Sequence, residues 1–244
     1  MRYLVLSDIH ANLEALEAVL AAERDVSQVL VLGDLVGYGA DPNAVIDRVR
    51  DLPLAAIVRG NHDKVAAGLA SVESFNPVAR QAITWTTKTL SPGSADWLAA
   101  LPQGPLSVTD HVEVCHGAPF DEDFYIFDEM DAQRAAPGVT RALCLFGHTH
   151  VPGVFRVGTT VSCERRPNKE PWVFSPAPPQ RALVNCGAVG QPRDGDPRAA
   201  YGVLDTDAGT LVLARVAYDV RGAQAKIVAA GLPAALANRL ALGR

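Results

Sequence analysis

The first quarter of the chain alternates between short apolar runs and segments with helical spacing of apolar residues. Three apolar runs predict strands, at Arg2–Ser7, Gln28–Leu32 and Leu54–Val58. A helix is expected between each pair: one capped by Asn12, and one running from Asp41, with Pro42 at its first position, to about Arg50. This alternation predicts a parallel sheet with right-handed crossovers.

The rhythm changes after a helical stretch at Pro77–Leu101, which Pro92 and Gly93 interrupt. Short strands are then expected at Leu106–Val108, Val112–Cys115, Leu143–Phe146, Gly153–Val157, Thr159–Cys163, Ala182–Asn185, Ala200–Asp205 and Thr210–Arg215. Their spacing predicts a second, more antiparallel sheet.

Two further segments complete the expected organisation. The proline-rich segment 165–179 predicts a surface loop or an edge hairpin, because proline cannot donate to a central ladder. The tail over 220–242 is helical in pattern, with a break at Gly231 and Pro233. No linker is long enough to divide the chain, so 1–244 is expected to form a single domain of mixed α/β class.

Composition excludes several classes of protein. Lys and Arg number 22 against 27 Asp and Glu, a formal net charge of −5, so no extended nucleic-acid binding is expected. No apolar run approaches the ~20 residues of a membrane span, and the amino terminus lacks the pattern of a signal peptide. The 4 cysteines contain no CxxC pair, which favours reduced thiols in a cytoplasmic protein.

Polar side chains follow five of the predicted strands directly. The sets are Asp8-Ile9-His10, Gly33-Asp34, Gly60-Asn61-His62-Asp63, His116-Gly117 and Gly147-His148-Thr149-His150. Open α/β sheets place their ligands at the carboxyl ends of parallel strands, so these loops are expected to converge on one crevice. Of the 6 histidines, only His111 lies outside this pattern, and we interpret it as an exposed strand residue.

The chemistry of these residues points to metal ions. Nitrogen and oxygen donors without thiolates suit borderline divalent ions such as Mn, Fe, Zn or Co, with Mn favoured. Seven candidate ligands are too many for one tetrahedral ion and suit two ions that share a carboxylate. These candidates are Asp8, His10, Asp34, Asn61, His116, His148 and His150.

The ordered motifs DIH, GDLVGYG, GNHD, HG and GHTH resemble those of the calcineurin-like metallophosphoesterase superfamily, in particular its compact prokaryotic phosphoesterases and diadenosine-polyphosphate hydrolases. The resemblance implies a two-sheet β-sandwich flanked by helices, with a dinuclear metal centre between the strand ends. By position, Asp8, His10 and His150 would bind one ion and Asp34 would bridge both. The second ion would then be completed by Asn61, His116 and His148.

The resemblance also implies a reaction. A hydroxide that bridges the two ions would attack phosphorus in line. His62 would contact the phosphate together with Asn61 and, when protonated, would stabilise the departing oxygen. Asp63, the next residue, is expected to orient the His62 imidazole.

Other residues near these motifs allow two interpretations. Arg193, in the glycine-rich run 187–193, would bind a phosphate or pair with Asp194 or Asp196. Tyr38 would line a substrate pocket. The aromatic group Phe120, Phe124, Tyr125 and Phe127 would line a pocket or, by the favoured interpretation, form a lid packed on the domain. The acidic run 121–123 is expected to be a solvated loop.

The expected function is hydrolysis of a small phosphomonoester or phosphodiester, such as a nucleotide or a dinucleoside polyphosphate. A protein Ser/Thr phosphatase is a second possibility, disfavoured because Leu35–Gly39 lacks the arginine that follows GD in those enzymes and because the third motif ends in Asp63 rather than glutamate. A non-catalytic metal-binding scaffold is the third, and the complete ligand set argues against it.

Overall fold

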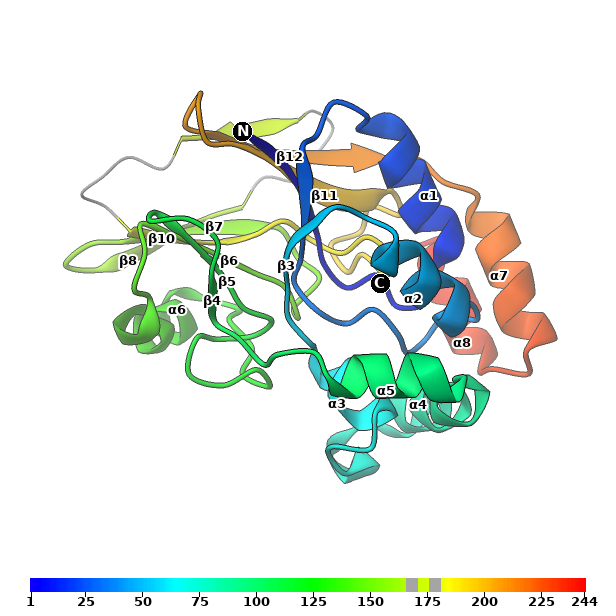
Figure 1. Cartoon of the computed structure of the whole chain (residues 1–244). Helices are drawn as coiled ribbons and strands as arrows, with labels where there is room; N and C mark the ends of the chain where they lie inside the picture. Colours follow the sequence, from blue (N-terminus) through cyan, green and yellow to red (C-terminus); the bar gives the residue numbers. More distant parts are fainter. Residues whose placement is uncertain (166–170, 176–180) are drawn as a thin grey trace.

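Two six-stranded sheets face each other, and helices cover both outer sides (Figure 1). The computed structural model describes residues 1–165, 171–175 and 181–244. This architecture confirms the expected α/β sandwich flanked by helices.

The first sheet has the strand order β3-β2-β1-β11-β12-β9. Strands β1, β2 and β3 are parallel, and β11, β12 and β9 continue the sheet in antiparallel pairs; Leu4 of β1, for example, lies between Val29 and Val203. The strands span Arg2–Leu6 (β1), Gln28–Val31 (β2), Leu54–Ile57 (β3), Trp172–Phe174 (β9), Ala199–Asp205 (β11) and Thr210–Val216 (β12).

The second sheet has the order β4-β5-β6-β10-β7-β8. Its centre, β5-β6-β10, is parallel, while β4 lies antiparallel at one edge and β7 and β8 lie antiparallel at the other. The strands span Leu106–Ser107 (β4), Val112–Val114 (β5), Leu143–Phe146 (β6), Gly153–Val157 (β7), Val161–Glu164 (β8) and Arg181–Asn185 (β10).

The expectation that all later strands form a second, more antiparallel sheet is wrong in two respects. Strands β11 and β12 join the first sheet, β11 beside β1 and β12 beside β11, and three strands of the second sheet are parallel. The physical reason is long-range pairing: β11 borders β1 from the far end of the sequence, which local apolar patterns do not record. As a result, both sheets present parallel strand ends to one edge of the sandwich.

Both sheets are apolar on both faces, which explains why their strands read as continuous apolar runs. Val5 and Leu30 of the first sheet pack against Leu145 and Val184 of the second, and these four side chains are buried. The opposite face of the first sheet packs on α1 (Leu13–Ala22), α2 (Pro42–Arg50) and α5 (Pro92–Ala99), and that of the second sheet on α6 (Glu129–Ala135).

The helix boundaries follow local capping chemistry in most places. Asn12 accepts a hydrogen bond from the Ala15 N–H at 3.1 Å, as expected of a cap. The break in the 77–101 helix lies just before Pro92, which begins α5. Asp41 precedes α2 but makes no capping bond, because its carboxylate instead accepts from Lys226 at 2.7 Å.

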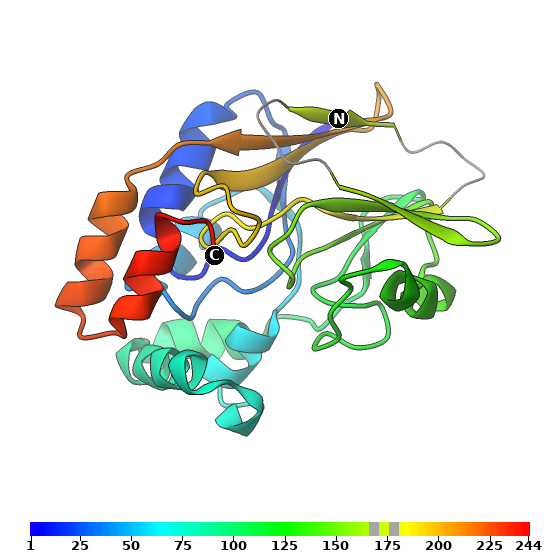
Figure 2. The same cartoon turned by 180° about the vertical axis from the view of Figure 1, so that it is seen from behind.

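The remaining helices lie around the polar loops at the strand ends. One of them, the short α3 (Asn61–Ala66), was not expected from the sequence pattern, and neither was α6 on the outer face of the second sheet. The helices α4 (Pro77–Thr89), α7 (Val220–Ala229) and α8 (Ala234–Leu240) pack together on Tyr38. Figure 2 shows the carboxyl terminus beside the loop that follows β10, and the Gly195 N–H donates to the Gly243 carbonyl there at 2.9 Å.

The proline-rich segment lies partly outside the described residues, including Pro167, Pro176, Pro178 and Pro179. Its described part contains β9, which pairs with β12 at the edge of the first sheet. Proline-rich flanks on an edge strand agree with the expected edge position. In the part of the chain that the structure describes, every helix is too short or too polar to span a bilayer.

Candidate metal centre

All the candidate ligands lie at the carboxyl ends of parallel strands. Asp8 and His10 follow β1, Asp34 follows β2, His116 follows β5, and His148 and His150 follow β6; Asn61 begins α3 after β3. The backbone there is unusual, because Asp8, His10, Asp34, His148 and His150 all have positive φ angles between 49° and 68°. Such angles are uncommon for non-glycine residues and gather at functional sites.

The candidate ligands form two buried groups that share one carboxylate. The first contains Asp8, His10, Asp34 and His150, and the second contains Asp34, His116 and His148. Within each group the donor atoms lie within 4.8 Å of one another. The two groups are consistent with a dinuclear metal site.

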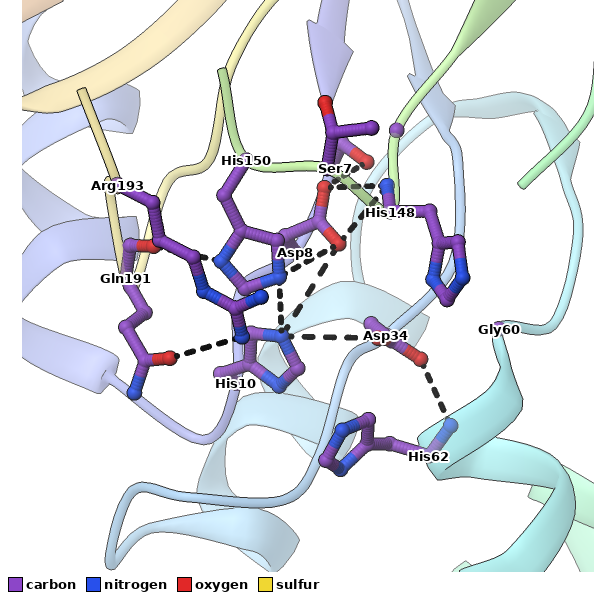
Figure 3. Close-up of polar contacts among 12 residues, drawn as sticks. Ser7, Asp8, His10, Asp34, Gly60, His62, His148, His150, Gln191 and Arg193 are labelled. Atoms are coloured by element: carbon purple, nitrogen blue, oxygen red, sulfur yellow. Dashed lines mark hydrogen bonds and ion pairs between the residues drawn. The ribbon is translucent and has the colours of Figure 1, made fainter. Parts of the chain in front are cut away.

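In the first group, two imidazole lone pairs face each other. His10 Nδ1 lies 2.9 Å from the Val36 carbonyl and His150 Nδ1 lies 2.6 Å from the Gln191 carbonyl, so each Nδ1 donates its hydrogen. Each Nε2 is then an unprotonated acceptor. These two Nε2 atoms lie only 3.1 Å apart (Figure 3), a repulsive contact unless a cation joins them.

The second group repeats this arrangement. His116 Nδ1 lies 2.8 Å from the Leu32 carbonyl and His148 Nε2 lies 3.2 Å from the Asp123 carbonyl. The other two ring nitrogens, His116 Nε2 and His148 Nδ1, lie 3.1 Å apart. Nitrogens that bind one ion at about 2.1 Å can lie at most about 4.2 Å apart, so both pairs fit a shared ion.

The carboxylates of Asp34 and Asp8 lie beside the histidine nitrogens, where they could bind the same ions. Asp34 Oδ2 lies 3.6 Å from His10 Nε2 and 3.4 Å from His116 Nε2, between the two histidine pairs. Asp8 Oδ1 lies 3.3 Å from His150 Nε2, and the Ser7 hydroxyl donates to Asp8 Oδ2 at 2.7 Å. Asp34 is therefore the group placed to bridge two ions.

Without an ion in the site, Asp34 and His116 stabilise each other as a charged pair, whose proton on His116 a bound metal would displace. Burial opposes ionisation of Asp34, but the nearby His116 holds the pKa of this carboxyl well below its usual range. Burial also opposes protonation of His116, yet Asp34 raises the pKa of His116 to about 10. Burial lowers the pKa of His10, His148 and His150, which leaves them as neutral donors suited to metal binding.

Asn61 completes the second group through its amide oxygen. Asn61 Oδ1 lies 3.3 Å from His116 Nε2, and its side chain is buried at the start of α3. The donor set is thus imidazole nitrogen with carboxylate and amide oxygen, and no thiolate belongs to it. This chemistry fits borderline divalent ions, without identifying which one.

His62 lies against the first group, held by stacking rather than by hydrogen bonds. Its ring stacks on Phe75 at 4.7 Å and lies 4.8 Å from the His10 ring. Its backbone N–H donates to Asp34 Oδ1 at 2.9 Å. A Cβ at Gly37, whose φ is +86°, would lie 2.3 Å from His62 Nδ1, so glycine is required there.

The expected contact between Asp63 and His62 is not formed. The Asp63 carboxylate instead accepts the backbone N–H groups of Gly60 at 3.0 Å and Val36 at 3.2 Å. His62 Nδ1 has no hydrogen-bond partner among the residues that the structure describes. Asp63 therefore ties two loops of the site together and does not orient the imidazole.

The protonated form of His62 expected from the sequence is also disfavoured. Burial lowers the pKa of this imidazole to about 4, although Asp34 opposes the shift. A neutral imidazole still carries one N–H and can donate a hydrogen bond.

Arg193 and Tyr38 border the first group. The Arg193 Nη2 donates to the Tyr38 hydroxyl at 3.3 Å, and the Tyr38 ring lies 4.6 Å from the His10 ring. Figure 3 shows the Arg193 side chain reaching from the loop after β10 toward His10 and His150. The alternative ion pairs are not formed: Asp194 pairs with Arg215 and Asp196 with Arg198.

A pocket of about 180 Å³ opens beside the second group. Asn61 and His148 form its inner end, and Phe75 and Tyr125 contribute aromatic side chains. The Tyr125 ring stacks on His148 with ring centroids 3.6 Å apart and is 40% exposed. Tyr125 therefore lines a pocket, which corrects the interpretation of this aromatic residue as part of a packed lid.

The rest of the aromatic group does not line this pocket. Phe120 and Phe127 are about half exposed, and Phe124 packs on Phe120. His111 is exposed, as expected, but lies in a bend before β5 rather than in a strand.

The acidic run 121–123 is only partly solvated. Glu122 is 5% exposed and binds Arg59 and Lys64, while the Asp123 carbonyl accepts from His148. Sequence reasoning missed these supporting groups, and it also missed the carbonyls of Leu32, Val36 and Gln191. A backbone carbonyl has no sequence signature; the buried Glu122 had only the weak signal of Arg59 and Lys64 close to the GNHD motif.

Comparisons with known proteins agree with this geometry. A family model described as the calcineurin-like phosphoesterase superfamily domain matches residues 1–209. An uncharacterised protein of Methanocaldococcus jannaschii is 35% identical over 98% of this chain and 97% of its own length. The crystal structure of a metallophosphoesterase from Sphaerobacter thermophilus is 39% identical, with a TM-score of 0.89 and 100% of both chains covered. A hypothetical protein of Pyrococcus horikoshii shares the fold at 16% identity, with a TM-score of 0.79 over 100% of this chain and 98% of its own.

Proposed function

The chain belongs to the calcineurin-like phosphoesterase superfamily and is a metal-dependent phosphoesterase, and from this premise we propose that it hydrolyses small phosphomonoesters or phosphodiesters at a dinuclear centre. The observation that carries the proposal is the convergence of four imidazole nitrogens, in two close pairs, on the shared carboxylate of Asp34. We assign Asp8, His10 and His150 to one ion, Asn61, His116 and His148 to the other, and Asp34 to both.

Two divalent ions at this place would polarise the phosphoryl oxygens and lower the pKa of a bound water, so that attack on phosphorus proceeds at neutral pH. The chain's own residues prepare for this. The carbonyls of Val36, Gln191, Leu32 and Asp123 fix which nitrogen of each imidazole carries the hydrogen. The Ser7 hydroxyl and the His148 N–H hold the Asp8 carboxylate in one orientation.

His62 is the residue that we place at the leaving oxygen. Its ring is confined between Phe75, Tyr38 and His10, with ring centroids 4.5 to 4.8 Å away. An imidazole N–H directed at the departing oxygen stabilises the charge that grows there as the ester bond breaks. Asp63 supports this placement from a distance, by holding the loops of Gly60 and Val36 together.

The pocket beside Asn61 and His148 suits a small leaving group. Its volume of about 180 Å³ and its two aromatic side chains, Phe75 and Tyr125, favour a ring-bearing substituent such as an aryl group or a nucleobase. A folded phosphoprotein would have to insert a phosphorylated side chain past Tyr125 and Asp123. A small phosphoester is therefore the substrate that this site supports best.

Manganese is the ion that we propose for the native enzyme. Nitrogen and oxygen donors in a buried carboxylate-containing site suit Mn²⁺, and no soft sulfur ligand favours another metal. Purified metal-free protein supplied in parallel with Mn²⁺, Zn²⁺, Fe²⁺, Co²⁺ or Mg²⁺ should show its highest rate with Mn²⁺. A higher rate with any of the other four ions than with Mn²⁺ would contradict this assignment.

The function itself is tested by Mn²⁺-stimulated hydrolysis of aryl phosphate monoesters and diesters. We expect wild-type protein to hydrolyse at least one of them, and Asp34→Asn to lose that activity. Metal content, measured on the same samples, shows whether an inactive protein carries its ions. Wild-type protein that is loaded with metal and yet no faster than Asp34→Asn would instead favour a non-catalytic scaffold.

A further inference from the structure

Two arginines from distant parts of the chain lie side by side next to the metal centre. Arg193 belongs to the loop after β10, and Arg239 lies in the last turn of α8. Both donate to the same oxygen, Gln191 Oε1, at 3.3 and 3.4 Å. Both guanidinium groups also face the Tyr38 ring, with their central carbons 5.7 and 5.9 Å from its centroid.

Neither Arg193 nor Arg239 has a carboxylate partner within the described residues, whereas two other arginines nearby do. On the same loop, Asp194 pairs with Arg215, and Asp196 pairs with Arg198 at 2.6 Å. The carboxylates closest in sequence to Arg193 are thus already engaged. The Arg193 Nε is buried and has no hydrogen-bond partner in the part of the chain that the structure describes.

Two like charges held together in a half-buried place carry an electrostatic cost. Burial and the charge of Arg193 both lower the pKa of Arg239. Unpaired buried charges are rare in folded proteins unless they serve a ligand. The cost is removed when an anion lies between the two guanidinium groups.

The position of the two arginines beside the metal centre indicates that the anion is part of a substrate bound there. Arg193 contacts the Tyr38 hydroxyl, and the Tyr38 ring lies 4.6 Å from the His10 ring, on the side of the first ion site. The aromatic pocket opens on the other side, beside Asn61 and His148. A phosphate at the metal centre would therefore have the arginine pair on one side and the leaving-group pocket on the other.

We infer that Arg193 and Arg239 bind a second phosphate group of the substrate, one that is close to the phosphate undergoing hydrolysis. This inference rests on the proposed function and narrows it to substrates with two neighbouring phosphates, such as nucleoside diphosphates and polyphosphates or bisphosphates. Guanidinium groups suit this task because their donors match phosphate oxygens in pairs. Arg239 lies outside residues 1–209, the part of the chain that the family model matches.

The test is calorimetric binding to the Mn²⁺-loaded full-length chain, with two non-hydrolysable probes. Methylenediphosphonate carries two phosphonate groups and methylphosphonate carries one. The variants are Arg239→Gln, Arg193→Gln and the charge-retaining Arg239→Lys. Arg221→Gln is the matched control, because Arg221 is an exposed arginine on the neighbouring helix α7. Metal content and thermal unfolding are recorded for each protein, so that a misfolded variant is recognised.

We expect Arg239→Gln to weaken methylenediphosphonate binding about tenfold or more, with a clearly smaller change for methylphosphonate, because one charge-assisted contact is lost. Arg193→Gln should likewise weaken methylenediphosphonate binding more than methylphosphonate binding, and Arg239→Lys should retain part of the preference for methylenediphosphonate. Equal weakening of both probes by Arg239→Gln, or an effect no larger than that of Arg221→Gln, would overturn the inference. The binding result does not depend on turnover. A wild-type protein without phosphoesterase activity would overturn the proposed function, whereas the role of the two arginines would still be decided by the binding of the two probes.

Discussion

The two flanks of the metal centre differ in chemistry and in origin. On one flank, Arg193 and Arg239 face Tyr38 and bring two positive charges without a carboxylate partner among the described residues. On the other, Phe75 and Tyr125 border a pocket of about 180 Å³, and the nearby Lys64 is already paired with Glu122 and Asp123. We propose that one flank binds an anion and the other a ring-bearing group.

Two chemically different flanks would let one catalytic centre orient an asymmetric substrate. Strand ends supply the ligands, whereas the loop after β10 and helix α8 supply the cationic flank, and the segments around Phe75 and Tyr125 supply the aromatic flank. Reaction chemistry and substrate choice therefore reside in separable parts of the chain. Substitutions in the metal centre or in one flank, and a change of salt concentration, can therefore separate the contributions of these parts.

The largest effect is expected from Asp34→Asn, which alters the centre that both flanks share. Its carboxylate lies between the two histidine pairs, 3.6 Å from His10 Nε2 and 3.4 Å from His116 Nε2. Loss of this charge should lower kcat about 10³-fold or more, since charge stabilisation by the ions is the main catalytic contribution. Steady-state rates with an aryl phosphate measure it, with Asp47→Asn, an exposed aspartate on α2, as the control.

The next effect concerns the leaving oxygen. His62→Ala should lower kcat for alkyl phosphates by about 10² to 10⁴, and much less for p-nitrophenyl phosphate, because a good leaving group needs little stabilisation. The ratio of the two losses is the measured quantity. Equal losses for alkyl and aryl esters would remove His62 from the leaving oxygen and reduce it to a packing role.

A smaller effect is expected on the aromatic flank alone. Tyr125→Ala should raise KM for aryl or nucleotide substrates about threefold to tenfold, the range expected for the loss of one aromatic contact. Phe120→Ala, which removes an aromatic side chain outside the pocket, should leave KM unchanged. An equal effect of both substitutions would show that the loop as a whole, rather than the Tyr125 ring, forms this flank.

The smallest effect expected is that of salt concentration on ligand binding, which should differ between the charged flank and the aromatic flank. Raising the salt concentration from 0.05 to 0.5 M should weaken methylenediphosphonate binding about twofold to fivefold, because partly exposed charges are screened. Binding of a neutral aryl group in the Tyr125 pocket should hardly change. If both respond alike to salt, the arginine flank contributes no specific charge recognition.

Much of the centre could be predicted from the sequence, because the ligands follow apolar runs directly. Asp8, Asp34 and His116 come directly after strands, and parallel strands bring their carboxyl ends together. The fold class followed from the same alternation. The expected placement of β11 and β12 in the second sheet was wrong, since β11 pairs with β1 across about 200 residues of sequence and β12 joins the sheet through β11.

The supporting residues escaped prediction for a different reason. Asp63 is next to His62 in sequence, yet its carboxylate points to the backbone of Gly60 and Val36, because the first turn of α3 directs successive side chains to different faces. Arg239 lies in an Ala/Leu-rich tail and has no motif around it. Only the packing of α8 beside the loop after β10 brings it to Gln191. The cytoplasmic location and the single-domain organisation stay predictions.

The central claim is a pair of ions that share the Asp34 carboxylate. Its most direct test is metal analysis combined with electron paramagnetic resonance of the Mn²⁺-reconstituted chain. We expect two Mn²⁺ per wild-type chain with an exchange-coupled spectrum, and loss of the coupling in Asp34→Asn. One Mn²⁺ per wild-type chain, with the six-line spectrum of an isolated ion, would contradict it.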